Sequence, residues 1–237
     1  MPGYTRRQLK QDKFAETAQD AAQWATGHRR TVVWGLTAVI AVVLITIAVF
    51  TWHSRQVEQG NDALATAMQT FDTPLRAPGT PAPADNAASY TSVVERAKAA
   101  EKQFKAVAEK YSMVAPGKIA GYMDGVALLQ AGDAAGAEQQ LKKSADSGDK
   151  DVAALAKMAL AGIYRSSNRA ADAAKLYKEV ADHPTNTVSK PTAQLELAEL
   201  YEKTDPQQAN ALYQEIQKDN PQSTAARVAA QKVSNKK

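Results

Sequence analysis

The sequence predicts an all-α protein in which a single transmembrane helix precedes an α-solenoid of helix pairs. Three observations lead to this fold class: a long run without charged side chains near the N-terminus, a C-terminal region rich in alanine and other good helix formers, and residues in that region that recur at a fixed spacing. Turn signals such as APGK, SGDKD and KTDPQQ interrupt the C-terminal region, so the pattern indicates several helices and not one.

The uncharged run covers 22 residues, from Thr31 to Trp52. As a helix it would be about 33 Å long, which suits one crossing of a hydrocarbon core about 30 Å thick. A cleaved signal peptide would have a shorter apolar run with small residues at its end, whereas this run ends in Trp52. A buried helix of a soluble protein would show a polar stripe, but only Thr37 and Thr46 lie inside the run. We therefore expect a permanent anchor, with Trp34 and Trp52 at the two membrane interfaces.

The charges beside the run predict its orientation. Residues 1–30 hold six Lys and Arg residues, including Arg29 and Arg30, whereas the 20 residues after the run hold only Arg55. Because cations are retained on the cytoplasmic side, the N-terminus should be cytoplasmic. In a bacterium, residues 53–237 would then lie in the periplasm, anchored to the inner membrane.

The remaining composition argues against several classes of function. Residues 1–30 carry three of the four excess positive charges, so the rest of the chain is nearly neutral and offers no electrostatic footprint for nucleic acid. The chain has no cysteine, and its histidines, His28, His53 and His183, are far apart in sequence. It has no phosphate-binding glycine loop and no serine-nucleophile motif. We expect no enzymatic activity, no metal site and no cofactor.

Composition also divides the chain into segments. Four prolines between Pro74 and Pro83 disfavour a helix there and favour an extended connection. The predicted segments are a cytoplasmic tail with the pattern of an amphipathic helix (1–30), the transmembrane helix (31–52), a membrane-proximal helix (53–71), a Pro/Ala-rich insertion (72–90) and a repeat domain (86–234). Within the repeat domain we expect the second helix of a divergent first repeat (86–111), three repeats (about 118–150, 154–186 and 191–222) and a C-terminal capping helix (223–234).

Residues in the repeat domain recur mostly 36 positions apart. Small residues in both helices of a pair would let the helices approach closely, and large residues would fill the space where the axes diverge. Since no pair buries its apolar face alone, neighbouring pairs must stack. An earlier half-copy (Ala100, Phe104, Val107) would pair with a helix in residues 54–71. The small residues are Gly125, Ala161 and Ala198 in first helices and Ala137, Ala173 and Ala209 in second helices, the latter followed four residues on by Leu141, Tyr177 and Tyr213.

These residues resemble the tetratricopeptide repeat, whose consensus combines such small and large positions with a closing proline. Residues 158–184, "MALAGIYRSSNRAADAAKLYKEVADHP", match well, and residues 195–221, "LELAELYEKTDPQQANALYQEIQKDNP", match nearly as well. Residues 123–149 match less well, because Asp124 stands where the family prefers leucine. The period of 36 or 37 residues exceeds the usual 34, and the excess falls in the joins between pairs.

The layout of one crossing, a cytoplasmic N-terminus and external repeats also resembles the ancillary subunit of the bacterial SecYEG translocon. That resemblance implies an inner-membrane protein whose partners are translocon subunits, periplasmic chaperones or exported clients. It implies a scaffold or chaperone-like adaptor as the function. Two alternatives stay open: a repeat scaffold for another envelope assembly, such as division, outer-membrane biogenesis or secretion, and a structural homo-oligomer.

The tetratricopeptide repeat family places its protein-binding groove on the first helix of each pair. The corresponding surface would be apolar at one end and charged at the other, which suits an extended or helical client segment. The Lys and Asn of the carboxylate-clamp version are absent from these positions, so an acidic C-terminal peptide is not the expected ligand. Burial under a neighbouring pair is an equally good reading of Tyr122, Val126 and Leu129. The implied groove residues are Ile119, Tyr122, Val126, Leu129, Leu155, Met158, Arg165, Leu195, Glu199 and Glu202.

Overall fold

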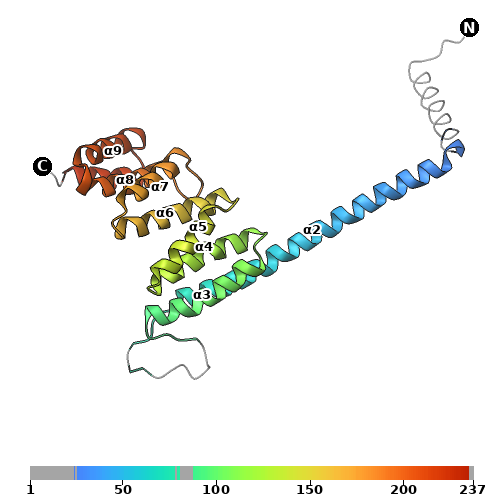
Figure 1. The fold of residues 1–237 in the computed structure, drawn as a ribbon, viewed down its shortest axis with the longest axis horizontal. Helices are drawn as coiled ribbons and strands as arrows, with labels where there is room; N and C mark the ends of the chain where they lie inside the picture. Colours follow the sequence, from blue (N-terminus) through green and yellow to red (C-terminus); the bar gives the residue numbers. More distant parts are fainter. Residues whose placement is uncertain (1–23, 25, 78, 81–87, 235–237) are drawn as a thin grey trace, which may run out of the picture. The chain divides into compact units, whose positions relative to one another are not determined.

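The computed structural model describes residues 24, 26–77, 79–80 and 88–234. Its regular elements in these ranges are all α-helices, and the chain divides after Arg55 into two compact units. Figure 1 shows the helices in chain order. Their bounds are α2 (Arg29–Asp72), α3 (Val93–Lys110), α4 (Ala115–Gln130), α5 (Ala134–Ala145), α6 (Lys150–Ser166), α7 (Ala170–Asp182), α8 (Lys190–Thr204), α9 (Pro206–Asp219) and α10 (Thr224–Ser234).

Helix α2 contains the predicted transmembrane run and continues beyond it. Residues 33–55 are all exposed, and the hydroxyl groups of Thr37 and Thr46 donate to carbonyl oxygens one turn back, each at 2.8 Å. We expected separate helices over 31–52 and 53–71, but one helix covers both because no proline lies between Thr31 and Asp72 to end it. The amphipathic pattern predicted in residues 1–30 lies almost wholly outside the described residues.

In the second unit, the C-terminal part of α2 packs against α3. The Phe71 and Phe104 rings meet edge to face with centroids 5.8 Å apart, and the Thr70 hydroxyl donates to Gln103 Oε1 at 3.0 Å. Ala67 lies in the same apolar cluster as Phe104. These contacts form the helix pair that the half-copy around Phe104 predicts.

Part of the proline-rich insertion is described where its ends meet. The Arg76 amide donates to the Tyr90 carbonyl at 2.8 Å, and Leu75 forms an isolated bridge with Tyr90. Arg96 of α3 donates from Nη1 to the Thr73 carbonyl at 2.9 Å. The insertion therefore leaves and re-enters the helix pair at one place, while residues 78 and 81–87 lie outside the described residues.

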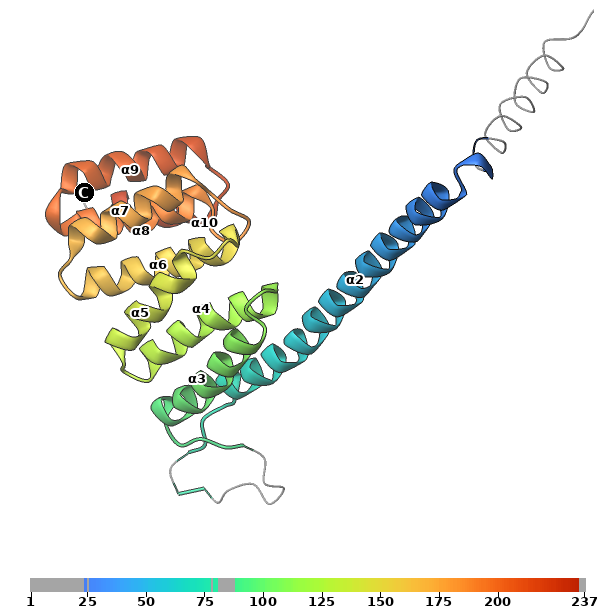
Figure 2. The ribbon, with the colours of Figure 1, turned by 45° about the vertical axis from the view of Figure 1, so that its right-hand side comes forward.

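Three further helix pairs follow, α4 with α5, α6 with α7 and α8 with α9, and α10 packs on the last pair (Figure 2). The turns within the first two pairs have equivalent residues with positive φ, Gly132 (+87°) and Asn168 (+61°), which are 36 residues apart. Glycine and asparagine adopt this left-handed conformation more readily than other residues. The sequence repeat thus reproduces a backbone turn as well as a packing pattern.

The recurring positions form the core. The apolar side chains fall into successive clusters along the stack, as expected when each pair contacts mainly its neighbours. Residues at the recurring positions of the second helices are at most 1% exposed: Ala137, Ala173, Ala209, Leu141, Tyr177 and Tyr213.

Two details of the repeat prediction are corrected. Helix α4 begins at Ala115 and α6 at Lys150, three and four residues before the predicted repeat starts. The APGK motif is not a turn, because Pro116 occupies the first turn of α4, where its missing N–H costs no hydrogen bond, and Gly117 follows inside the helix. For α6, Asp149 caps the amides of Asp151 and Val152, which fixes the earlier start.

Candidate protein-binding face

The groove residues implied by the family resemblance lie on the first helices α4, α6 and α8. Ile119, near the start of α4, is the most exposed of the apolar ones at 39%. The other apolar positions are only partly exposed. Five of them pack on apolar clusters: Tyr122, Leu129 and Met158 on the central cluster, Leu155 and Met158 on the cluster around Val180, and Leu195 on the C-terminal cluster. Val126 is half-buried.

These apolar side chains therefore contribute to the joins between pairs. Tyr122 and Leu129 of α4 contact the cluster that contains Leu160 and Ile163 of α6. Burial raises the pKa of the Tyr122 hydroxyl. Burial under a neighbouring pair, the alternative stated above, therefore applies to some of the implied groove residues. The exposed apolar surface on α4 is smaller than the sequence alone implies.

At the other end of the set, the charged residues pair with one another across helices. Arg165 Nη1 of α6 lies 2.9 Å from Glu196 Oε2 and 4.0 Å from Glu199 Oε2, both on α8. Lys232 of α10 lies 3.4 Å from Glu199 Oε1 and 3.5 Å from Glu202 Oε2. The ion pairs form a chain across α6, α8 and α10, which we call the charged chain. Its carboxylates are partly neutralised and do not form an open acidic surface.

Sequence reasoning missed two members of the charged chain, Glu196 and Lys232. Glu196 is not among the groove positions that the family resemblance implies, and Lys232 lies in the C-terminal helix outside the repeat pattern. A usable signal was available, because Arg165 and Glu196 are oppositely charged and lie on successive first helices. The buried Tyr213 hydroxyl donates to Glu202 Oε1 at 3.0 Å. Its pKa is raised by burial and next by the hydrogen bond to this carboxylate.

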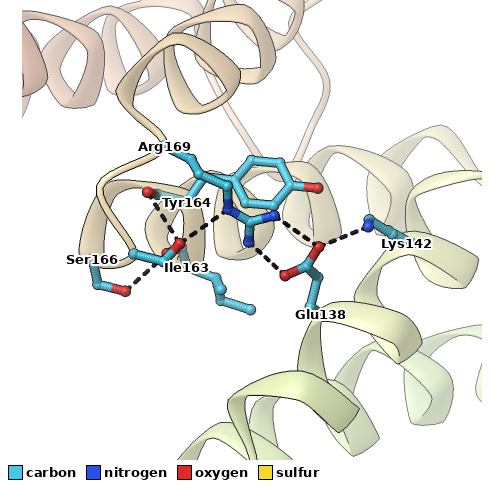
Figure 3. Close-up of polar contacts among 7 residues, drawn as sticks. Glu138, Lys142, Ile163, Tyr164, Ser166 and Arg169 are labelled. Atoms are coloured by element: carbon cyan, nitrogen blue, oxygen red, sulfur yellow. Dashed lines mark hydrogen bonds and ion pairs between the residues drawn. The ribbon is translucent and has the colours of Figure 1, made fainter.

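A second charged cluster connects the first full pair to the next (Figure 3). Arg169, which precedes α7, donates to both carboxylate oxygens of Glu138 on α5 and lies over the Tyr164 ring at 4.0 Å from its centroid. Lys142 Nζ lies 2.7 Å from Glu138 Oε1. The hydrogen bond from Arg169, and next that from Lys142, lower the pKa of Glu138 to about 2. A two-pronged guanidinium contact with ring stacking fixes direction as well as distance.

The predicted anchor and topology residues lie on α2. Trp34 is 74% exposed and Trp52 is 54% exposed, and Arg29 and Arg30 form the start of the helix. Of the described helices, α2 is long and apolar enough to cross a membrane, and its apolar stretch is not buried.

A family model described as a tetratricopeptide repeat-like domain matches residues 22–185. The chain belongs to this family. The match ends before α8, so the α8–α9 pair and α10 extend the repeat-like array beyond it. No curated protein and no solved structure matches the chain. Because domains of this family present extended surfaces to other proteins, the chain is a protein-binding scaffold.

Proposed function

We propose that the protein is a single-pass scaffold of the bacterial inner membrane, with a cytoplasmic N-terminus and periplasmic repeats, that assists protein export beside the translocon. The observation that carries the anchor is the exposure of large apolar side chains along α2. A soluble protein would not leave such a surface in water over about six turns of helix, since exposed apolar patches on soluble proteins are usually small. The exposed side chains include Trp34, Leu36, Ile40, Leu44, Phe50 and Trp52, each at least 50% exposed.

The polar groups of α2 also suit a lipid environment. The hydroxyl groups of Thr37 and Thr46 are already paired with backbone carbonyls of their own helix. Polar groups in hydrocarbon must find such internal partners, because lipid tails offer none. The excess of Lys and Arg before Thr31 supports the proposed orientation.

Two observations support a role at the translocon: the resemblance to the translocon subunit family and the exposed apolar side chains on α4. Ile119 remains accessible there, beside partly exposed Tyr122 and Val126. A small apolar surface next to charged side chains suits a segment that is apolar but not yet folded. A scaffold for another envelope assembly would use the same face with different partners, and a homo-oligomer would cover it with a second copy.

The absence of cysteine gives a direct test of anchoring and orientation. Single cysteines at Gly27 and at Ser234 would be treated in intact spheroplasts with a membrane-impermeant maleimide. We expect labelling at position 234 and none at position 27 until the cells are lysed, and we expect the protein to stay in membranes washed with alkaline carbonate. The reverse labelling pattern, or release by carbonate, would contradict the proposal.

The partner is tested by photocrosslinking in cells from a benzoylphenylalanine at Ile119. We expect adducts with translocon subunits or exported chains, identified by mass spectrometry, and no such adducts from the exposed control position Lys175 of α7. Adducts with division or outer-membrane assembly proteins would favour the second candidate. An adduct at twice the protein's mass that contains only this chain would favour the homo-oligomer.

A further inference from the structure

Asp124 of α4 is a buried carboxylate whose hydrogen bonding is incomplete. Its side chain is 4% exposed, and its Oδ1 atom has no hydrogen-bond partner within the part of the chain that the structure describes. Buried polar atoms are nearly always paired, so an unpaired carboxylate oxygen needs an explanation. The consensus leucine would avoid the desolvation cost altogether.

Asp124 lines a pocket of about 470 Å³ between the second helices α3 and α5. This pocket lies away from the implied groove residues, none of which lines it. Four carboxylates and two ammonium groups surround it, so it carries a net negative charge when Asp124 is ionised. The charged lining residues are Glu101, Lys105, Glu109, Asp124, Asp133 and Lys143.

The hydrogen-bond donors that line the pocket either already donate elsewhere or are outnumbered by carboxylates. Gln140 on α5, which also lines the pocket, donates from Nε2 to the Gly121 carbonyl at 3.0 Å. Burial, and next the charge of Glu101, raise the pKa of Asp124 to about 6, and Glu109 acts in the same direction. Lys105 and Lys143 lower it but do not cancel these effects. The protein itself thus leaves the carboxylate short of positive charge.

We propose that this pocket binds an arginine or lysine side chain of a protein partner, with Asp124, which lines it, as the acceptor. A guanidinium or ammonium group in the pocket would supply the missing positive charge, and rotation of the buried carboxylate toward it would give Oδ1 its missing donor. Charged hydrogen bonds of this kind are stronger than neutral ones, especially where water is excluded. The inference rests on the protein-binding role, but it is independent of membrane topology. It adds a second recognition site, on the side of the second helices.

The test uses the full-length protein in detergent micelles and two small probes, acetyl-arginine methylamide and its uncharged citrulline counterpart. Binding would be followed by NMR through the Asp124 side-chain carboxyl carbon and the backbone amides of α4 and α5. We expect saturable shifts with the arginine probe, at least tenfold weaker binding of the citrulline probe, and at least tenfold weaker binding of arginine to Asp124→Asn. Binding to the wild type should strengthen as pH rises through about 6, because the ionised carboxylate is the acceptor.

Asp133→Asn is the matched control. It removes one negative charge from the same pocket, and asparagine can still accept the hydrogen bond from Gly136 that caps α5. We expect about a twofold loss of arginine binding, as for one distant screened charge. Equal losses in both variants would reduce the effect to bulk electrostatics and overturn the proposal.

Asp124→Leu, which restores the family preference, should abolish arginine binding and raise the melting temperature. If Asp124→Asn or Asp124→Leu binds arginine as the wild type does, the carboxylate is not the acceptor and the proposal fails. A failed outcome here would leave the labelling pattern at positions 27 and 234 unaffected, so the two proposals are tested separately.

Discussion

The α3–α4 junction and the junctions among α6, α8 and α10 are packed by different means. At the first, backbones are in close contact, because a methyl group at Gly117 would lie 2.0 Å from the Tyr111 carbonyl oxygen. At the others, Arg165 and Lys232 bridge successive helices through ion pairs. The first junction is thus specified by shape and the later ones partly by charge, which predicts different responses to mutation and salt.

Gly117→Ala should have the largest effect. The added methyl group would overlap the backbone of the α3–α4 turn, which cannot move aside as a side chain can, so we expect a loss of about 3 kcal/mol or more in the free energy of unfolding. Urea unfolding followed by circular dichroism would measure it.

Gly162→Ala in α6 is the matched control, because nothing lies within 4 Å of its added methyl group. We expect it to stabilise the protein by about 0.5–1 kcal/mol, as alanine does relative to glycine within a helix. If both variants behave alike, the close contact at Gly117 does not determine the stability of the first junction.

Gly125→Ala and Leu141→Ala should have effects that depend on each other. A methyl group at Gly125 would lie 2.7 Å from Leu141 Cγ, so Gly125→Ala should cost about 1–3 kcal/mol by overpacking. Leu141→Ala should cost about 2–5 kcal/mol by leaving a cavity, because Leu141 is fully buried.

The double variant should be less destabilised than the sum of the two, since each change makes room for the other. A double-mutant cycle from denaturant unfolding would measure the difference. Simple additivity would mean that the helices separate instead of repacking, and that the shape of this pair is not specific.

Glu138→Gln should have the smallest effect. The pKa of Glu138 is lowered from 4.5 to about 2, so its ion pairs stabilise the folded state above pH 4.5, and this contribution disappears as pH falls toward 2. Since the pair is partly exposed to solvent, we expect a melting temperature lower by about 2 °C at neutral pH.

The difference for Glu138→Gln should vanish in about 1 M NaCl, where the Debye length is about 3 Å. Differential scanning calorimetry in low and high salt would measure it, with exposed Glu58→Gln as the control. A loss that persists at high salt would show that Glu138 acts through packing, and the contact between α5 and the start of α7 would then not be specified by charge.

The sequence predicted the second helices better than the surfaces between pairs. Ala137, Ala173 and Ala209 are buried as the 36-residue spacing requires, because each repeat places them against the same helix partner. Gly117 was interpreted as part of a turn, since a Pro-Gly pair marks a helix start and a loop equally well. No periodicity could show that Asp124 would line a pocket, because the pocket is made by α3, α4 and α5 together.

The groove prediction shows the same limit. The family pattern placed Tyr122, Leu129 and Met158 on the first helices, where they lie, but their exposure depends on how far each pair overlaps the next. The pairing of Glu199 and Glu202 with Lys232 depends on a helix outside the repeats. Position along a helix was therefore predictable, whereas accessibility was not.

Asp205 ends α8 and begins α9 at the same time. Its amide donates to the Tyr201 carbonyl at 2.8 Å, and its carboxylate accepts from the Gln208 amide at 3.0 Å. Because one residue caps both helices, no linker separates them, and unfolding of one helix would remove the cap of the other. We therefore expect the α8–α9 pair to unfold as one cooperative unit, and we expect a loop inserted between these two helices to disrupt both.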